Sequence, residues 1–126
     1  MNYIIAFKSN KFDVSKENKN PINPIYGESL LSWLKVQVKD RFDMPDPEPE
    51  DWGWYTFVEC NGRSYLVGSS ATKNTSGYEW ELQIDKQRTL KEKLFGQQKM
   101  TKSDVCLNYL LEVVKSEGEF TDVMLF

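Results

Sequence analysis

Histidine is absent from this sequence of 126 residues. It is the usual general base near neutral pH, the usual partner of a serine or cysteine nucleophile and the commonest zinc ligand. Its absence excludes most familiar hydrolase mechanisms and leaves carboxylate or lysine chemistry to an enzyme. The sequence assigns no catalytic, cofactor-binding or metal-binding residue, so we expect a protein that is not an enzyme and has no cofactor.

Cysteine is scarce as well. The two cysteines, Cys60 and Cys106, stand far apart and in no CxxC or CxxxH arrangement. This spacing indicates neither redox nor zinc chemistry. Because cytosolic thiols normally stay reduced, and Cys106 falls on the apolar face of a predicted helix, we expect it to be a buried and unreactive thiol.

Long apolar runs and basic blocks are also missing. The apolar run near the N-terminus covers residues 3–7, whereas a signal peptide needs about 7–15 apolar residues and a spanning helix about 20. We therefore expect no membrane partner and a cytoplasmic protein. The chain has 16 basic and 19 acidic residues, a net charge of −3 and no Lys/Arg block longer than two. Because phosphate neutralisation needs clustered positive charge, no nucleic-acid partner is expected.

Aromatic residues are plentiful, at 13% of the chain, and hydrophobic residues make up 40%. This composition is typical of a folded protein and argues against disorder along the whole chain. A chain of this length can remove roughly two thirds of its unfolded surface from water. We expect one domain covering residues 1–126.

Five segments have the composition of β-strands, and we predict them at 3–7, 54–60, 64–68, 78–85 and 120–126. Asn61-Gly62, between the second and third, is the strongest short hairpin signal because both central positions of a type I′ turn need positive φ. Apolar and polar residues alternate through 78–85, so one face of that strand meets the core and the other meets water. The stretch 69–77 is polar and predicts a loop.

Three segments have helical patterns. Leu30, Leu34, Val38 and Phe42 recur every four residues and predict a helix over 28–41. A short helix over 89–95 is predicted from Leu90, Leu94 and Phe95 on one side. A last helix follows the capping-box-like stretch 101–104.

Two segments carry neither pattern. The Lys- and Asn-rich stretch at about 9–24 predicts a mobile loop, and the alternate prolines at 45, 47 and 49 predict an extended, polyproline-like segment. Together the elements predict an α+β fold in the order β-α-β-β-β-α-α-β. Its mostly antiparallel sheet has about five strands, three of them in a meander, and the helices pack on one face.

The least generic stretch is Glu50-Asp51-Trp52-Gly53-Trp54. In a structural interpretation, Gly53 permits a tight bend, the indoles flank the sheet and the carboxylates accept backbone N–H bonds. In a functional interpretation, an acidic rim beside exposed indole surface grips a basic protein or a cationic ligand. A carboxylate pair acting as acid and base is a third interpretation. The candidate interaction site comprises Asp46, Glu48, Glu50, Asp51, Trp52 and Trp54.

Several short motifs together resemble a group of small bacterial proteins without an assigned function. They are Tyr26-Gly27, Leu30-Leu31-x-Trp33-Leu34, the stretch 49–54, Glu79-Trp80, Leu94-Phe95-Gly96 and Asp122-Val123. The Glu-Asp-Trp-Gly-Trp motif is the most specific of them. The resemblance implies a recurring pattern and carries no activity over to this chain.

Three functional hypotheses remain open at this point. The first is a non-catalytic cytoplasmic protein-binding domain of the immunity or antitoxin kind, fit to occupy the basic surface of a toxin or nuclease. The alternative is a small-ligand-binding protein or carboxylate-dependent enzyme, with Glu50, Asp51, Glu79 or Glu81 in a pocket between sheet and helices. The third is a subunit that dimerises through a strand edge, so both monomer and dimer are open.

Overall fold

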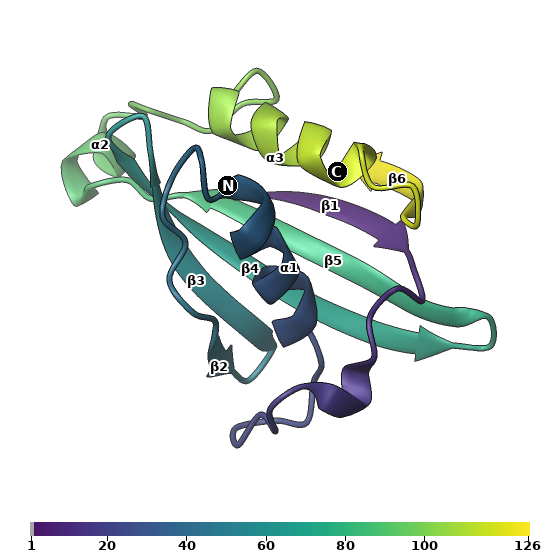
Figure 1. The fold of residues 1–126 in the computed structure, drawn as a ribbon. Helices are drawn as coiled ribbons and strands as arrows, with labels where there is room; N and C mark the ends of the chain where they lie inside the picture. Colours follow the sequence, from purple (N-terminus) through teal and green to yellow (C-terminus); the bar gives the residue numbers. More distant parts are fainter. Residues whose placement is uncertain (1) are drawn as a thin grey trace.

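A six-stranded antiparallel sheet, in the spatial order β2-β3-β4-β5-β1-β6, forms the centre of the computed structural model, which describes residues 2–126 (Figure 1). The strands are β1 (Tyr3–Lys8), β2 (Glu48–Glu50), β3 (Gly53–Cys60), β4 (Arg63–Asn74), β5 (Gly77–Lys86) and β6 (Thr121–Leu125). The helices are α1 (Glu28–Val38), α2 (Leu90–Leu94) and α3 (Val105–Lys115), with a 3-10 turn, η1, at Val14–Lys16. The predicted α+β class and mostly antiparallel sheet are confirmed.

The sheet has one strand more than expected. The segment predicted to be polyproline-like contains β2, in which Glu48 pairs with Tyr55 and Glu50 with Gly53. Proline is compatible with this strand because β2 lies at the edge of the sheet, where Pro49 need not donate to a further neighbour. The prediction missed β2 because a three-residue edge strand leaves no alternating pattern.

Strand β4 corrects a second expectation. The polar stretch 69–77, predicted as a loop, continues β4 as far as Asn74, and its ladder with β5 runs without interruption from Tyr65 to Asn74. The pairing with β5 outweighs the low hydrophobicity of the stretch, since β propensity depends on cross-strand neighbours. The other hairpin is as predicted, with positive φ at Asn61 and Gly62.

The core occupies one face of the sheet. On β5, Trp80, Leu82 and Ile84 have no exposed surface, and they alternate with residues that point the other way. Helices α1 and α3 cover this face, and their buried residues belong to the same cluster (Figure 1). The helical members are Leu30, Leu31, Leu34 and Val38 of α1 and Cys106, Leu107, Leu110, Leu111 and Val114 of α3.

The short helix α2 does not help to cover the core. It contains no buried residue, and the exposed fractions of Leu90, Leu94 and Phe95 are 74%, 73% and 69%. The prediction that every amphipathic helix packs on the sheet is therefore wrong for this element. One turn of helix, followed by Gly96 at positive φ, projects beyond the end of the sheet instead (Figure 1).

Two side chains tie the segment before α1 to the rest of the fold. The Glu17 carboxylate accepts hydrogen bonds from the backbone N–H groups of Gly27 and Ser29, 3.0 and 2.9 Å away, and so satisfies free donors at the start of α1. The buried Asn20 amide donates to the carbonyls of Glu50 and Gly53. The mobility expected at 9–24 stays a prediction. Helix α1 ends at Val38, three residues earlier than expected.

A disulfide joins Cys60, at the end of β3, to Cys106, in the first turn of α3. The expectation of an unreactive free thiol at Cys106 is therefore wrong. The two residues lie 46 apart in the sequence, and their proximity follows from the packing of α3 beside the end of β3. Because disulfides are typical of oxidising compartments, the basis for expecting reduced thiols is lost, and a cytoplasmic location stays a prediction.

We predict that the Cys60→Ala/Cys106→Ala variant loses about 2–4 kcal/mol of unfolding free energy, the range expected for a cross-link closing a loop of this size. Urea unfolding followed by tryptophan fluorescence measures the loss. Reductant should shift the wild type towards the variant and leave the variant unchanged. An unchanged midpoint for the reduced wild type would contradict the assignment.

An ion pair fixes α2 to the sheet. The Arg63 guanidinium donates to both Glu92 carboxylate oxygens, at 2.9 and 2.8 Å. The Glu92 side chain also accepts from the backbone N–H of Thr89, which completes a capping box at the start of α2. These hydrogen bonds, those from Arg63 first, lower the pKa of Glu92 to about 2. The pair attaches α2 to β4 through charge and geometry instead of apolar packing.

The lowered pKa of Glu92 predicts a dependence of stability on pH. The ionised carboxylate stabilises the fold above its ordinary pKa of 4.5, and this contribution is lost as the pH falls towards 2. The Glu92→Gln variant lacks the contribution at neutral pH, so we expect its urea midpoint to fall less steeply than that of the wild type between these values. Parallel slopes would show that the pair does not stabilise the folded state.

Candidate functional site

The face of the sheet opposite α1 and α3 is the candidate site, and we call it the outer face. Successive residues of a strand point to opposite faces, so the residues that alternate with the core residues point outward here. The outward residues are Glu48, Glu50, Tyr55, Phe57, Glu59, Leu66, Gly68, Ser70, Thr72, Glu79, Glu81, Gln83, Asp85, Ile4, Ala6, Lys8, Met124 and, at the end of the chain, Phe126. Both long helices lie over the other face (Figure 1).

Charge is distributed unevenly on the outer face. It carries the carboxylates of Glu48, Glu50, Glu59, Glu79, Glu81, Asp85 and Asp122. Among the described strand residues that point this way, Lys8 is the basic one, and its ammonium lies 3.6 Å from the Asp122 carboxylate. The whole chain is nearly balanced, with 19 acidic and 16 basic residues. The outer face is therefore far more acidic than the protein as a whole.

The carboxylates of β5 form a row in the middle of the sheet. Glu79 and Glu81 are two residues apart on the same side of one strand, roughly 7 Å in extended chain. The cross-strand neighbours of Glu81 are Ala6 and Ser70, so no basic residue stands directly beside it. Adjacent like charges on one face repel each other, and a bound cation would relieve that repulsion.

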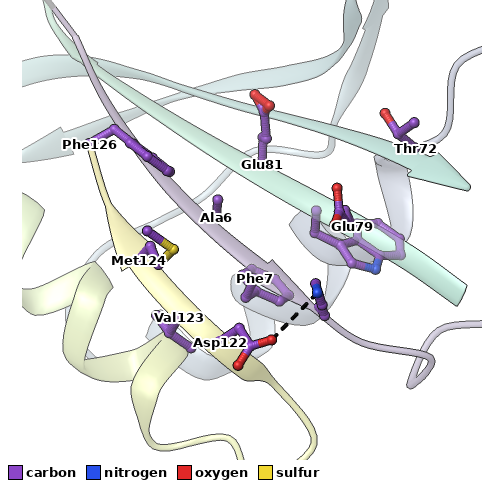
Figure 2. A pocket seen from close by; sticks show the side chains of 11 residues that line it. Ala6, Phe7, Thr72, Glu79, Glu81, Asp122, Val123, Met124 and Phe126 are labelled. Carbon is purple, nitrogen blue, oxygen red and sulfur yellow. Dashed lines mark ion pairs between the residues drawn. The ribbon is translucent and has the colours of Figure 1, made fainter. Parts of the chain in front are cut away.

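A hollow of about 560 Å³ lies beside this row, over β5, β1 and β6. Figure 2 shows Ala6 in its centre, the carboxylates of Glu79 and Glu81 along one side, and Met124 and Phe126 along the other. The exposed fractions of Met124 and Phe126 are 54% and 60%. One acidic side and one apolar side fit a cationic group carried on an apolar stem, such as a lysine or arginine side chain.

Aromatic side chains occupy the other end of the outer face, over β3 and β4. The half-buried Trp52 ring lies over Gly68, where a Cβ would collide with the indole. Tyr55 and Phe57 make an edge-to-face contact with ring centroids 5.8 Å apart, and the Tyr55 hydroxyl donates to Glu48 at 3.3 Å. Aromatic surface next to carboxylates is typical of protein interfaces and of sites that hold cations.

The six residues predicted as an interaction site do not form one site. Glu48 and Trp52 lie with the outer face, whereas Trp54 is buried on the core face and donates its indole N–H to the Ile25 carbonyl. The Asp46 carboxylate pairs with Lys35 of α1.

The remaining two predicted residues lie at the β2–β3 turn. Glu50 accepts a hydrogen bond from the backbone N–H of Asp51, and the Asp51 carbonyl accepts one from the Asn23 side chain. The Glu50 carboxylate thus binds backbone nearby, as in the structural interpretation, and its side chain is on the same side of β2 as that of Glu48. The Asp51 contact uses the backbone carbonyl, and the two indoles divide between the faces of the sheet. Trp52 stays part of the candidate site and Trp54 belongs to the core.

Sequence reasoning missed the hollow, although one signal pointed to it. The alternation through 78–85 predicted that Glu79 and Glu81 face water, as they do. Met124 and Phe126 join them because β1 lies between β5 and β6, a pairing that brings the last residues of the chain beside the first. Strand order of this kind has no local sequence signal.

The pocket predicted between sheet and helices does not contain Glu79 or Glu81. Glu79 and Glu81 point to the outer face, away from both long helices. Within residues 2–126, no cluster of three or more Cys, Asp or Glu side chains is placed to hold a metal ion. No helix in this part of the chain has the length and apolar character needed to cross a membrane.

Comparison of the chain with protein-family models, with curated proteins and with solved structures finds no match. The resemblance to small bacterial proteins therefore stays a prediction, and the geometry of the outer face is what supports a functional proposal.

We predict that Gly68→Ala moves the Trp52 ring off the outer face, because the added Cβ would occupy the space of the indole. Acrylamide quenching of tryptophan fluorescence should increase relative to the wild type. The same substitution in a Trp52→Ala background should change quenching little. An equal increase in both backgrounds would show that the effect arises elsewhere.

Proposed function

We propose that this protein is a non-catalytic binding protein that holds a basic protein partner against the outer face. The observation that supports the proposal most is the acidic and aromatic character of a sheet face on which neither long helix packs. Carboxylates grouped on one face steer a basic partner during encounter and set its orientation. Exposed aromatic and apolar side chains give such a surface its contact area.

The arrangement suggests how the binding free energy would divide. Phe57, Met124 and Phe126 offer apolar contacts, since each is about half exposed in the free protein. The Glu79–Glu81 pair supplies charge in the middle of the same surface. Glu79 stands opposite Lys8, whereas the cross-strand neighbours of Glu81 are uncharged. A lysine or arginine entering the hollow would meet both kinds of contact at once.

Within this class, an immunity- or antitoxin-like role is the one we favour. A small acidic domain can occupy the basic surface that a toxin or nuclease uses to bind nucleic acid. Action in the bacterial cytoplasm is part of this proposal. The disulfide between Cys60 and Cys106 is instead typical of an oxidising compartment, so the location needs its own test.

A second candidate is a protein that binds a small cationic ligand. The hollow of about 560 Å³ falls within the range of roughly 300–1,000 Å³ typical of small-molecule sites. Its apolar side and its paired carboxylates would suit an amine with a hydrocarbon stem. In this case the aromatic end of the outer face would have no role.

The test is affinity capture with a charge-reversed outer face. The tagged wild type and the Glu79→Lys/Glu81→Lys variant are incubated with native cell lysate, and retained proteins are identified by mass spectrometry. We expect a basic protein that the wild type retains and the variant retains at least about tenfold less, because close charge pairs at interfaces contribute more than 1.4 kcal/mol. Circular dichroism checks that both forms are folded.

The matched control is Asp40→Lys/Glu112→Lys, which makes the same change in net charge at exposed residues away from the outer face. This control should retain the partner. Equal loss in both variants would mean that net charge, not the outer face, governs binding. Retention of no basic protein by the wild type would contradict the proposal and favour the small cationic ligand.

A further inference from the structure

A second surface, which is basic where the outer face is acidic, lies around α2. We call residues 88–99 the α2 tip. Its apolar members are Leu90, Leu94 and Phe95, each about 70% exposed. Leu90 and Leu94 are four residues apart on one helix and so share a face. Large apolar side chains scattered singly on a surface need no explanation, but three in one projecting turn indicate a contact that the free chain does not make.

The basic residues around α2 have no acidic partners. The stretch 86–102 contains Lys86, Arg88, Lys91, Lys93, Lys99 and Lys102, and one acidic residue, Glu92. Glu92 is already paired with Arg63 of β4. Among the ion pairs of residues 2–126, none involves these six basic side chains. These residues form no continuous basic block in the sequence because polar and apolar residues separate them.

We propose that the α2 tip docks on an anionic lipid surface, with its three apolar side chains entering the interface and the lysines around them contacting the headgroups. The charge of the tip requires an anionic counterpart, and its apolar side chains require a partner that also offers hydrocarbon. An anionic bilayer presents both within the reach of one short helix.

The shape of the tip favours a membrane over a protein or a nucleic acid. Helix α2 projects from one end of the sheet and is exposed at every residue except Glu92 (Figure 1). A projecting apolar turn can enter a soft interface, whereas a protein partner would need a preformed cavity to receive it. A phosphate backbone would neutralise the lysines but leave Leu94 and Phe95 in water.

The contacts that hold the α2 tip in place favour docking on a membrane surface. The bidentate Arg63–Glu92 pair and the hydrogen bond from Arg88 to the Gln97 carbonyl hold the turn in shape without burying its apolar side chains. At its base, the disulfide between Cys60 and Cys106 links β3 to α3. The apolar side chains are thus presented already ordered, which lowers the entropy lost on binding.

Peripheral docking is compatible with the finding that no helix within residues 2–126 is long and apolar enough to span a membrane. The expectation of no membrane partner rested on spanning and signal segments, and a surface contact requires neither. The proposal is also independent of the outer face, since it uses different residues and the opposite charge.

Vesicle flotation tests the proposal, with phosphatidylcholine vesicles that either contain or lack phosphatidylserine. We expect the wild type to float with the phosphatidylserine vesicles and not with the neutral ones, and binding to fall as salt shortens the Debye length below about 10 Å. Lys91→Glu/Lys93→Glu should weaken binding at least about tenfold, since each basic residue near such a surface contributes about 1 kcal/mol. Leu94→Ser/Phe95→Ser should weaken it similarly through lost insertion.

Two controls match these variants away from the tip. Lys73→Glu/Lys115→Glu repeats the charge change at exposed lysines outside the tip, and Val36→Ser removes an exposed apolar side chain from α1. Both should bind like the wild type. Failure of the wild type to float with anionic vesicles at low salt would overturn the proposal, and so would equal loss in the tip and control variants.

Two further outcomes would redirect the proposal to another occupant. Binding of a single-stranded oligonucleotide that depends on Lys91 and Lys93 but not on Phe95, without vesicle binding, would identify a phosphate contact and overturn lipid docking. Capture of an acidic protein through Leu94 and Phe95, again without vesicle binding, would do the same in favour of a protein partner. Neither result bears on the outer face, which is tested with different variants.

Discussion

The register of β5 is the constraint on which the rest of the structure depends. Trp80, Leu82 and Ile84 are completely buried against the helices, and the residues between them carry carboxylates that point the other way. A slip of one residue would place those carboxylates in the core, so burial of one face fixes the chemistry of the other. The indole N–H of Trp80 donates to the Ser9 carbonyl, which satisfies the polar group of the largest core residue. The acidic outer face is therefore the reverse side of the hydrophobic core.

Charge is separated across the molecule as a consequence. Acidic residues of β2, β3, β5 and β6 gather on the outer face, while an unpaired basic cluster lies around α2 at one end of the sheet. The net charge of −3 conceals this separation because the two surfaces nearly cancel. Two surfaces of opposite charge can engage two partners of opposite chemistry at the same time. In that arrangement a protein bound at the outer face and a lipid surface at the α2 tip would not compete.

Local patterns predicted the parts of the fold that depend on local chemistry. The Asn61-Gly62 turn, the alternation on β5 and the helices α1 and α3 could all be recognised because turn geometry, strand period and helical period act over a few residues. The exposure of Glu79 and Glu81 followed from the same alternation. To that extent the acidic half of the candidate site was predictable.

The parts that were missed depend on long-range packing. The extension of β4 through polar residues needs β5 beside it, and the disulfide needs α3 beside the end of β3. The apolar side of the hollow needs β6 next to β1, which joins residues more than a hundred positions apart. For helix α2 the helical pattern was recognised, but the prediction that its apolar residues pack on the sheet was wrong, because they face water. A pattern can show that a side chain has a partner, but it cannot show whether that partner lies within the same chain.

The most direct test of the central claim, that the outer face recognises basic protein surface, is an NMR titration with a lysine-rich peptide as the probe. The indoles provide internal markers, because Trp52 lies on the outer face whereas Trp54 and Trp80 lie in the core. We expect chemical-shift changes at the amides of Glu79 and Glu81 and at the Trp52 indole, with the Trp54 and Trp80 indoles and α3 unaffected. Changes confined to α1 and α3, or none at the outer face at saturating peptide, would contradict the account.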